Sequence, residues 1–214
     1  PNVGTSGVAG VGDFHWGPVG VLTTISSESE LASQFGKPSD TNFVDWFSAR
    51  NVLSYTGYLA LIRAIDSNAR NSTDDGIGTV IKNSTHFEVV NSSTPGFSFA
   101  ARYPGKLGNS ISVSLADVNT FSSWDYKAQF DFAPGTSDFV ANLGGKDDEL
   151  HIILIDTNGE FTGTPGAVLE RFSFVSKAKD AVDLNNAPNY YASVINRNSK
   201  YVWALAPISG AAVG

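Results

Sequence analysis

Residues 58–66 (YLALIRAID) form the apolar run that most constrains how this chain can fold. A short, continuous apolar run is typical of a buried strand. A second strand is expected at 7–15, where apolar residues alternate with glycines, and the segment between the two is patterned for helices. A strand–helices–strand order predicts a parallel crossover. The first third of the chain should therefore form a small α/β unit.

Two helices are expected within this crossover. The first begins after Ser27, because Ser27 and Glu30 have capping-box spacing and Gly36 is a suitable C-terminal stop. The second should run from about 42 to 55 and end at Gly57. Its apolar residues cover more than one face of the helix, so we expect it to be largely buried.

The composition changes at Asp66, because residues 66–76 contain no large apolar side chain and are expected to form a linker or a long loop. Short β-rich runs follow, and 111–115 alternates cleanly, as a half-buried strand should. Asn158-Gly159 lies between two such runs and predicts a hairpin. The remaining expected elements are strands at 78–81, 86–90, 96–102, 126–132, 150–156, 168–175 and 201–205, and a short helix at 190–196.

The predicted fold class is α+β, a small α/β crossover unit with an inserted antiparallel β-rich domain. The α/β unit takes residues 1–70 together with 199–214, and the β-rich domain takes 77–198. This division depends on the strands at 58–66 and 201–206, because they flank the β-rich block.

Composition excludes several classes of function. The formal net charge of −7 argues against binding nucleic acid, which requires a basic face. The absence of cysteine excludes disulfides, thiolate metal sites and a cysteine nucleophile. No run approaches the roughly 18 apolar residues of a membrane span. The chain begins at Pro1 and contains no methionine, which indicates a processed or excised piece of a longer product.

No catalytic constellation stands out. The three histidines, His15, His86 and His151, are far apart in the sequence. The acidic residues before His151 are more typical of a charged turn than of a metal site. We therefore expect no catalytic residue, no metal and no cofactor. An enzyme would require a pocket in which one of these histidines meets a carboxylate.

Several collinear stretches point to a family. The first three are Trp16-Gly17-Pro18, Leu31 with Phe35-Gly36, and 61–66 (LIRAID). The later ones are 101–109 (ARYPGKLGN), 169–173, 191–196 and 199–202. In this order they resemble contractile bacteriophage tail sheath proteins of the myovirus type, and ARYPGKLGN resembles that family's Tyr-Pro-Gly-x-x-Gly-Asn turn before a strand. The matches span nearly all of the chain.

The resemblance implies a structural, non-enzymatic role. Subunits of that family stack as six-fold rings around a tail tube, and on a baseplate trigger the sheath shortens and drives the tube through the host envelope. The implied partners are other sheath subunits, the tail tube protein and the baseplate, with no nucleic acid and no membrane. The implied location is the virion, after assembly in the host cytoplasm. The family's terminal arms and C-terminal domain have no counterpart here, so we expect this piece to be monomeric.

Two further expectations concern surfaces. An alternative function is a carbohydrate- or receptor-binding β module of a phage particle, which exposed Trp124 and Tyr126 in a groove would favour. Under the sheath interpretation, the candidate subunit contacts are exposed acidic loop residues, namely Asp74, Asp75, Asp147 and Asp148.

Overall fold

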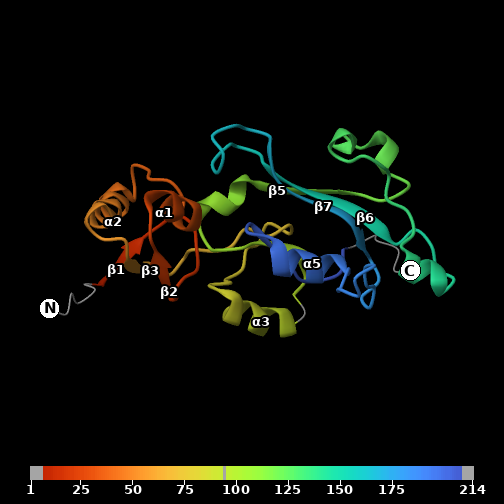
Figure 1. Cartoon of the computed structure of the whole chain (residues 1–214), viewed down its shortest axis with the longest axis horizontal. Coiled ribbons are helices and arrows are strands. Elements are labelled where there is room, and N and C mark those ends of the chain that lie inside the picture. The colour runs from red at the N-terminus through yellow and green to blue at the C-terminus, as the bar shows by residue number, and fades with distance from the viewer. Residues whose placement is uncertain (1–6, 94, 209–214) are drawn as a thin grey trace.

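The computed structural model describes residues 7–93 and 95–208, which form an α/β unit near the N-terminus and a larger β-rich part (Figure 1). Both helices and antiparallel strands are present, so the predicted α+β class is confirmed. The elements of the α/β unit are β1 (Val8–Asp13), β2 (Leu22–Ile25), α1 (Glu28–Phe35), α2 (Phe43–Tyr55) and β3 (Leu59–Ala64).

The sheet of the α/β unit has the order β1-β3-β2. Strands β1 and β3 are parallel, which confirms the predicted crossover, and β2 lies antiparallel on the other side of β3. Strand β2 was not predicted, because four residues that include two threonines are too few for a periodic pattern. Both helices pack on one face of this sheet, around a core that includes Phe14, Ile25, Leu31 and Phe35 (Figure 1).

Helix α1 begins and ends as predicted. The Ser27 side chain accepts a hydrogen bond from the Glu30 backbone N–H at 3.2 Å, and the Gly36 N–H donates to the Ala32 carbonyl. The Glu30 carboxylate accepts from the N–H and the hydroxyl of Ser26, one residue before the cap. The Ser27 hydroxyl thus satisfies the Glu30 N–H in the first turn, and the Glu30 carboxylate satisfies the Ser26 N–H that precedes it.

Helix α2 is less buried than predicted. Trp46 and Ala49 face the sheet, but Phe43, Val44 and Phe47 are 53%, 62% and 44% exposed. The expectation of a largely buried helix is wrong, because in the described residues α2 has one layer of strands to pack against and its second apolar face meets no partner.

The β-rich part is built on the antiparallel sheet β5-β6-β7, against which α5 packs (Figure 1). The predicted strand at 111–115 and the predicted hairpin partners are confirmed, although the hairpin connection spans 157–166 and is not a tight Asn158-Gly159 turn. The elements are α3 (Ser84–Ser92), β4 (Phe99–Ala101), η1 (Lys106–Ser110), β5 (Ile111–Ala116), η2 (Phe121–Ser123), η3 (Lys127–Gln129), α4 (Asp138–Asn142), β6 (Glu149–Asp156), β7 (Ala167–Ser176), α5 (Tyr191–Asn198) and β8 (Val202–Ala204).

Three predicted strands are wrong. Residues 86–90 lie in helix α3, because the Asn83 side chain accepts from the His86 N–H and caps the helix. Residues 126–132 contain the single 3-10 turn η3, and 78–81 form no named strand. Two of these predictions rested on short β-rich runs and the one at 126–132 on alternation, and none had a predicted pairing partner to support it.

The last strand pairs differently from the prediction. Strand β8 was expected to complete the sheet of the α/β unit, but it pairs antiparallel with β4, with Ala204 opposite Phe99. Trp203 of β8 stacks on Phe87 of α3 at 4.0 Å between ring centroids, which binds the strand to the β-rich part. The pairing expectation is therefore wrong, and parts of the predicted α/β unit, residues 1–6 and 209–214, lie outside the described residues. Among the described residues, no helix has the length and apolar character that crossing a membrane demands.

Candidate functional site at the junction of the two parts

Arg63 on β3 is the centre of the contact between the α/β unit and the β-rich part, which we call the junction. Its side chain is buried, and its guanidinium donates to the carbonyls of Phe14, Gly17 and Pro104. The nitrogen–oxygen distances are 2.8 Å to Gly17 and 2.7 Å to Pro104. Burial lowers the pKa of Arg63 to about 10, so the group stays protonated at neutral pH. Three carbonyl dipoles thus hold a buried cation that forms no ion pair in the described residues.

Gly105 permits this close approach. Its φ angle is +134°, and a Cβ there would lie 3.1 Å from the Arg63 Nη2 and 3.1 Å from the His15 carbonyl. The Gly105 N–H also donates to the Arg70 carbonyl at 3.0 Å. A side chain at this position would disturb both the backbone conformation and the Arg63 contact.

Trp16 joins the two parts through aromatic contacts. Its ring meets Tyr103 edge-on at 5.3 Å and Phe161 edge-on at 4.9 Å between centroids, and Phe161 meets Tyr201 at 5.1 Å. The indole is 4% exposed. These rings come from the turn after β1, the turn before η1, the β6–β7 connection and the residue before β8, so they tie four distant segments together.

Asp156, at the end of β6, positions Phe161 for this contact. Its buried carboxylate accepts from the N–H groups of Phe161 and Thr162 at 3.0 Å and 2.8 Å, and from the Ser110 hydroxyl at 2.6 Å. Burial alone raises the pKa of Asp156, but the hydrogen bonds outweigh it and the pKa lies below its usual range. In the sequence, Asp156 is an acidic residue at the end of an apolar strand. That position could have indicated its role, but the sequence pattern predicted only a hairpin there.

Four of the seven stretches that carried the family resemblance meet at the junction. Trp16-Gly17-Pro18 supplies the indole, 61–66 supplies Arg63, 101–109 supplies Pro104 and Gly105, and 199–202 supplies Tyr201. Sequence reasoning treated these stretches as separate markers and did not predict their contact. A single arginine in an otherwise apolar strand was the signal that could have identified the centre of the site.

Within the part of the chain that the structure describes, no histidine is hydrogen-bonded to a carboxylate. His15 lines a cavity of about 430 Å³ that also contains Asp13, Asp66 and Glu160, but its Nε2 lies 2.9 Å from the Thr41 hydroxyl. Burial lowers the pKa of His15, although the Asp13 charge opposes this shift. Within the described residues, no group of three or more His, Asp and Glu side chains has the arrangement to hold a metal ion.

The other two histidines have structural partners. His86 accepts from the Lys82 N–H through Nδ1, inside the first turn of α3. His151 is fully buried and stacks on Phe130 at 4.2 Å, while its Nδ1 accepts from the Phe174 N–H and its Nε2 bonds the Phe132 carbonyl. Its Nδ1 therefore acts as an acceptor in the neutral ring.

The four predicted contact residues are not brought together as one surface. Asp74 and Asp75 are exposed, and Asp74 accepts from the Ser98 and Phe99 N–H groups in front of β4. Asp148 is fully buried and accepts from the Ser137 N–H at 2.8 Å, so the expectation that it is an exposed contact is wrong. A charged residue before a strand was assumed to face solvent, but here it organises the loop around it.

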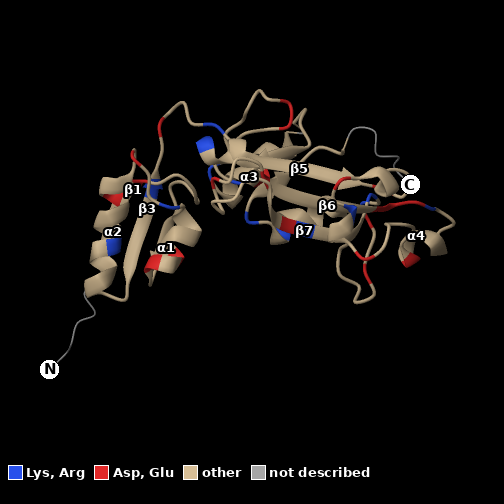
Figure 2. Cartoon of the chain, turned by 90° about the horizontal axis from the view of Figure 1, so that it is seen from above, with Lys and Arg blue, Asp and Glu red and all other residues tan. Residues whose placement is uncertain are grey.

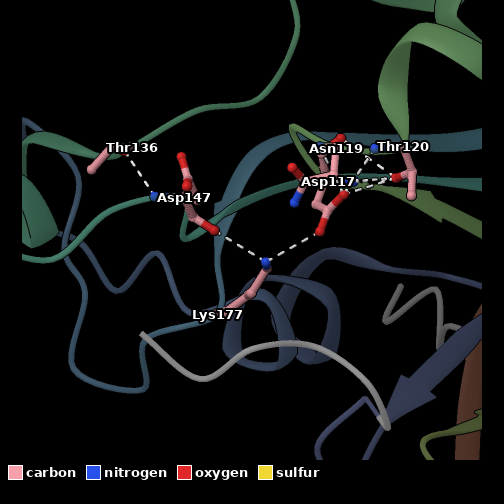
Figure 3. A network of polar contacts seen from close by, with 6 residues as sticks. All are labelled: Asp117, Asn119, Thr120, Thr136, Asp147 and Lys177. Carbon is pink, nitrogen blue, oxygen red and sulfur yellow. Dashed lines mark hydrogen bonds and ion pairs between the residues drawn. The ribbon is translucent and has the colours of Figure 1, made fainter.

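Asp147 is half-buried in a polar network beside β6 (Figure 3). Its carbonyl accepts from the Lys177 Nζ at 3.1 Å, and Lys177 also lies 3.6 Å from the Asp117 carboxylate. Burial raises the pKa of Asp117, but hydrogen bonds from Thr120 and the Lys177 charge lower it overall. The network fixes the strand ends at this side of the sheet.

Trp124 and Tyr126 do not support the carbohydrate-binding alternative. Both are half-buried, and the Trp124 indole N–H donates to the Ser114 hydroxyl at 2.8 Å. The indole also stacks on Phe130 at 5.4 Å. The indole N–H and one face of the Trp124 ring are therefore engaged within the chain.

No protein-family model matches the chain. The chain is 32% identical over 170 residues to the tail sheath protein of Salmonella phage ViI, covering 78% of this chain and 25% of the relative. It is 40% identical over 70 residues to the tail sheath protein of Vibrio phage KVP40, covering 32% and 10%, and 31% identical over 121 residues to that of Enterobacteria phage T4, covering 56% and 16%.

Among solved structures, the sheath tail protein Lin1278 of Listeria innocua aligns with 92% of this chain and 29% of its own, at 12% identity and a TM-score of 0.43. The chain spans a quarter or less of the length of the curated relatives it matches.

Proposed function

Because this chain belongs to the family of phage tail sheath proteins, we propose that it forms part of a subunit that polymerises as helical six-fold rings around a tail tube. In this proposal the sheath contracts and drives the tube through the host envelope. The observation that carries the proposal is the collinear match to three tail sheath proteins, which reaches 78% of this chain in one of them. The role is structural and not enzymatic.

The junction supports this proposal physically. A subunit that transmits force during contraction must keep its parts in a fixed relation while its contacts with neighbours rearrange. Arg63 and Trp16 connect the α/β unit to the β-rich part through buried hydrogen bonds and packed rings. Such a connection suits a subunit that moves as a rigid body.

The proposed partners are neighbouring sheath subunits, the tail tube protein and the baseplate. The proposed location is the virion, after assembly in the host cytoplasm. Asp74, Asp75 and the half-buried Asp147 remain candidates for contacts between subunits.

The test is assembly of the full-length protein, followed by negative-stain microscopy. We expect tubes or polysheaths with helical order. A protein with intact terminal segments that stays monomeric at every concentration contradicts the proposal. Cryo-microscopy of extended virion tails should place these residues outside the tube, and their presence in another particle component would also contradict it.

A further inference from the structure

Positive charge is concentrated in one cavity of an acidic chain. The sequence has 14 Lys and Arg against 21 Asp and Glu. A cavity of about 390 Å³ lies between α1 and the residues before β8, and Glu160 is the acidic residue among those that line it. Its four basic lining residues, which define the basic pocket, are Lys37, Arg102, Arg197 and Lys200.

Three of these cations are open to a ligand. Lys37, Arg197 and Lys200 are exposed, and none belongs to either of the ion pairs found in the described residues. The Lys200 N–H donates to the Glu170 Oε1 at 2.8 Å, which fixes the backbone of this segment. Even when Glu170 is counted beside Glu160, four cations face two carboxylates, so the pocket attracts anions.

Arg102 is the fixed cation of the pocket. Its guanidinium lies 3.4 Å from the centroid of the Trp203 ring and donates to the Asn196 carbonyl at 3.2 Å. An arginine held in this way is preorganised to bind a carboxylate, because little side-chain entropy remains to be lost.

Aromatic rings complete the pocket wall. Trp16, Tyr103, Phe161 and Tyr201 line the cavity and pack on one another at the junction. Arginine and large aromatic residues are the side chains that dominate binding energy at protein interfaces. The pocket therefore suits a carboxylate that stands beside an apolar group.

A segment of this chain has the complementary chemistry. Residues 124–138 carry exposed Asp125, Asp131 and Asp138 against one cation, Lys127, and Phe132 within it is 73% exposed. We call this segment the acidic loop. Asp131-Phe132 places a carboxylate directly beside an exposed ring, which matches the walls of the basic pocket.

The two surfaces lie at different ends of the molecule. Figure 2 shows α4, which begins at the last residue of the acidic loop, at the end away from the α/β unit, whereas the basic pocket borders α1 of that unit. One copy cannot bring its own loop to its own pocket without unfolding. A contact between them must join two copies, and a head-to-tail contact of this kind generates rings or helical filaments.

We propose that the basic pocket binds the acidic loop of a second copy of this chain in a head-to-tail contact of the assembled sheath. The inference rests on the proposed function, because it assigns one contact within that assembly. Asp131 pairs with the cations of the pocket, and Phe132 lies against its rings.

The first test reverses charges in the full-length protein. The variant Arg197→Glu/Lys200→Glu should raise the critical concentration for tube formation at least tenfold, and adding Asp125→Lys/Asp131→Lys should restore it. The matched control Lys82→Glu/Lys146→Glu changes the net charge equally at exposed cations outside the pocket and should assemble normally. Unchanged thermal unfolding of the pocket variant excludes misfolding.

The second test is a cross-link. These 214 residues contain no cysteine. In a full-length protein whose cysteines outside them are replaced by serine, Lys200→Cys combined with Asp131→Cys introduces one defined pair of thiols. Oxidation of assembled tubes should produce a ladder of covalent oligomers, and oxidation of each single variant should not give that ladder.

The outcomes separate the two proposals. If the pocket variant forms tubes at the same critical concentration as the wild type, the inference is wrong and the proposed function stands. Loss of assembly that the loop reversal does not restore, together with no cross-linked ladder, overturns the acidic loop as the occupant. A wild-type protein that forms no tubes overturns the proposed function and the inference with it.

Discussion

The guanidinium of Arg63 donates to the Pro104 carbonyl at 2.7 Å, a contact between residues 41 positions apart that joins β3 to the turn before η1. The same side chain bonds the carbonyls of Phe14 and Gly17. One buried cation thus connects the crossover strands to the β-rich part.

Replacement of Arg63 should destabilise the protein strongly. Arg63→Met leaves three carbonyls without their donor, and the free energy of unfolding should fall by about 3 kcal/mol. Arg63→Lys should recover only part of this loss, because the single ammonium of lysine cannot reach all three carbonyls with the geometry of a guanidinium. Denaturant unfolding measures both variants. Equal stability of the methionine variant and the wild type would contradict the role of Arg63.

Gly105→Ala should also destabilise the junction. The added Cβ meets the Arg63 Nη2 and the His15 carbonyl at 3.1 Å, and the φ of +134° is strained for alanine. We expect a loss of about 2 kcal/mol. Gly57→Ala is the matched control, because a Cβ there meets no atom within 4 Å. Thermal unfolding followed by circular dichroism compares the two variants. Equal changes in their melting temperatures would show that the close approach of Gly105 to Arg63 is unimportant for stability.

Acidification should weaken the fold through His151. Burial lowers the pKa of His151 in the folded state from its usual 6.5, so the unfolded chain binds the proton first as the pH falls. The stabilisation by neutral His151 is complete above about pH 6.5 and is lost as the pH falls from there toward the folded pKa. Unfolding free energies at pH 7.5 and 5.5 measure this difference.

His151→Gln should reduce the pH dependence between those two values. His15→Gln is the companion variant, because burial also lowers the pKa of His15 and its share must be measured separately. If the unfolding free energy still falls between pH 7.5 and 5.5 in His151→Gln, but no longer falls in His15→Gln, then His15 and not His151 causes the pH dependence.

Asp148→Ala should cost more stability than a substitution at an exposed aspartate. Removal of the buried carboxylate leaves the Ser137 N–H and the hydroxyls of Ser137 and Ser176 unpaired, for a loss of about 3 kcal/mol. Asp75→Ala, at an exposed position, should lose about 0.5 kcal/mol. Urea unfolding compares the two, and a similar loss at both positions would contradict the assignment of Asp148 to the interior.

The sequence was sufficient for elements whose signal is local. The capping residues Ser27 and Gly36 predicted both ends of α1 correctly, and the apolar run at 58–66 contains β3. The segment at 86–90 was mistaken for a strand, because the Asn83 cap that makes it a helix lies outside the apolar pattern. Local patterns identify an element only when its ends are included in the pattern.

The candidate site could not be predicted in the same way, because it depends on contacts between distant segments. Nothing next to Arg63 in the sequence indicates that its acceptors are at positions 14, 17 and 104. Asp148 and Asp147 are neighbours of the same charge, yet one is buried and the other half-buried. Burial of a charged residue is decided by the partners that the tertiary fold brings to it.

The acceptors of Arg63 are main-chain oxygens, and every amino acid carries one. The residues at positions 14 and 104 can therefore change, as far as this contact is concerned, without removing an acceptor. The demand on side-chain identity falls instead on Arg63 itself and on Gly105, where no Cβ fits comfortably. Relatives that diverge widely in sequence can keep this junction if they retain a guanidinium and a glycine.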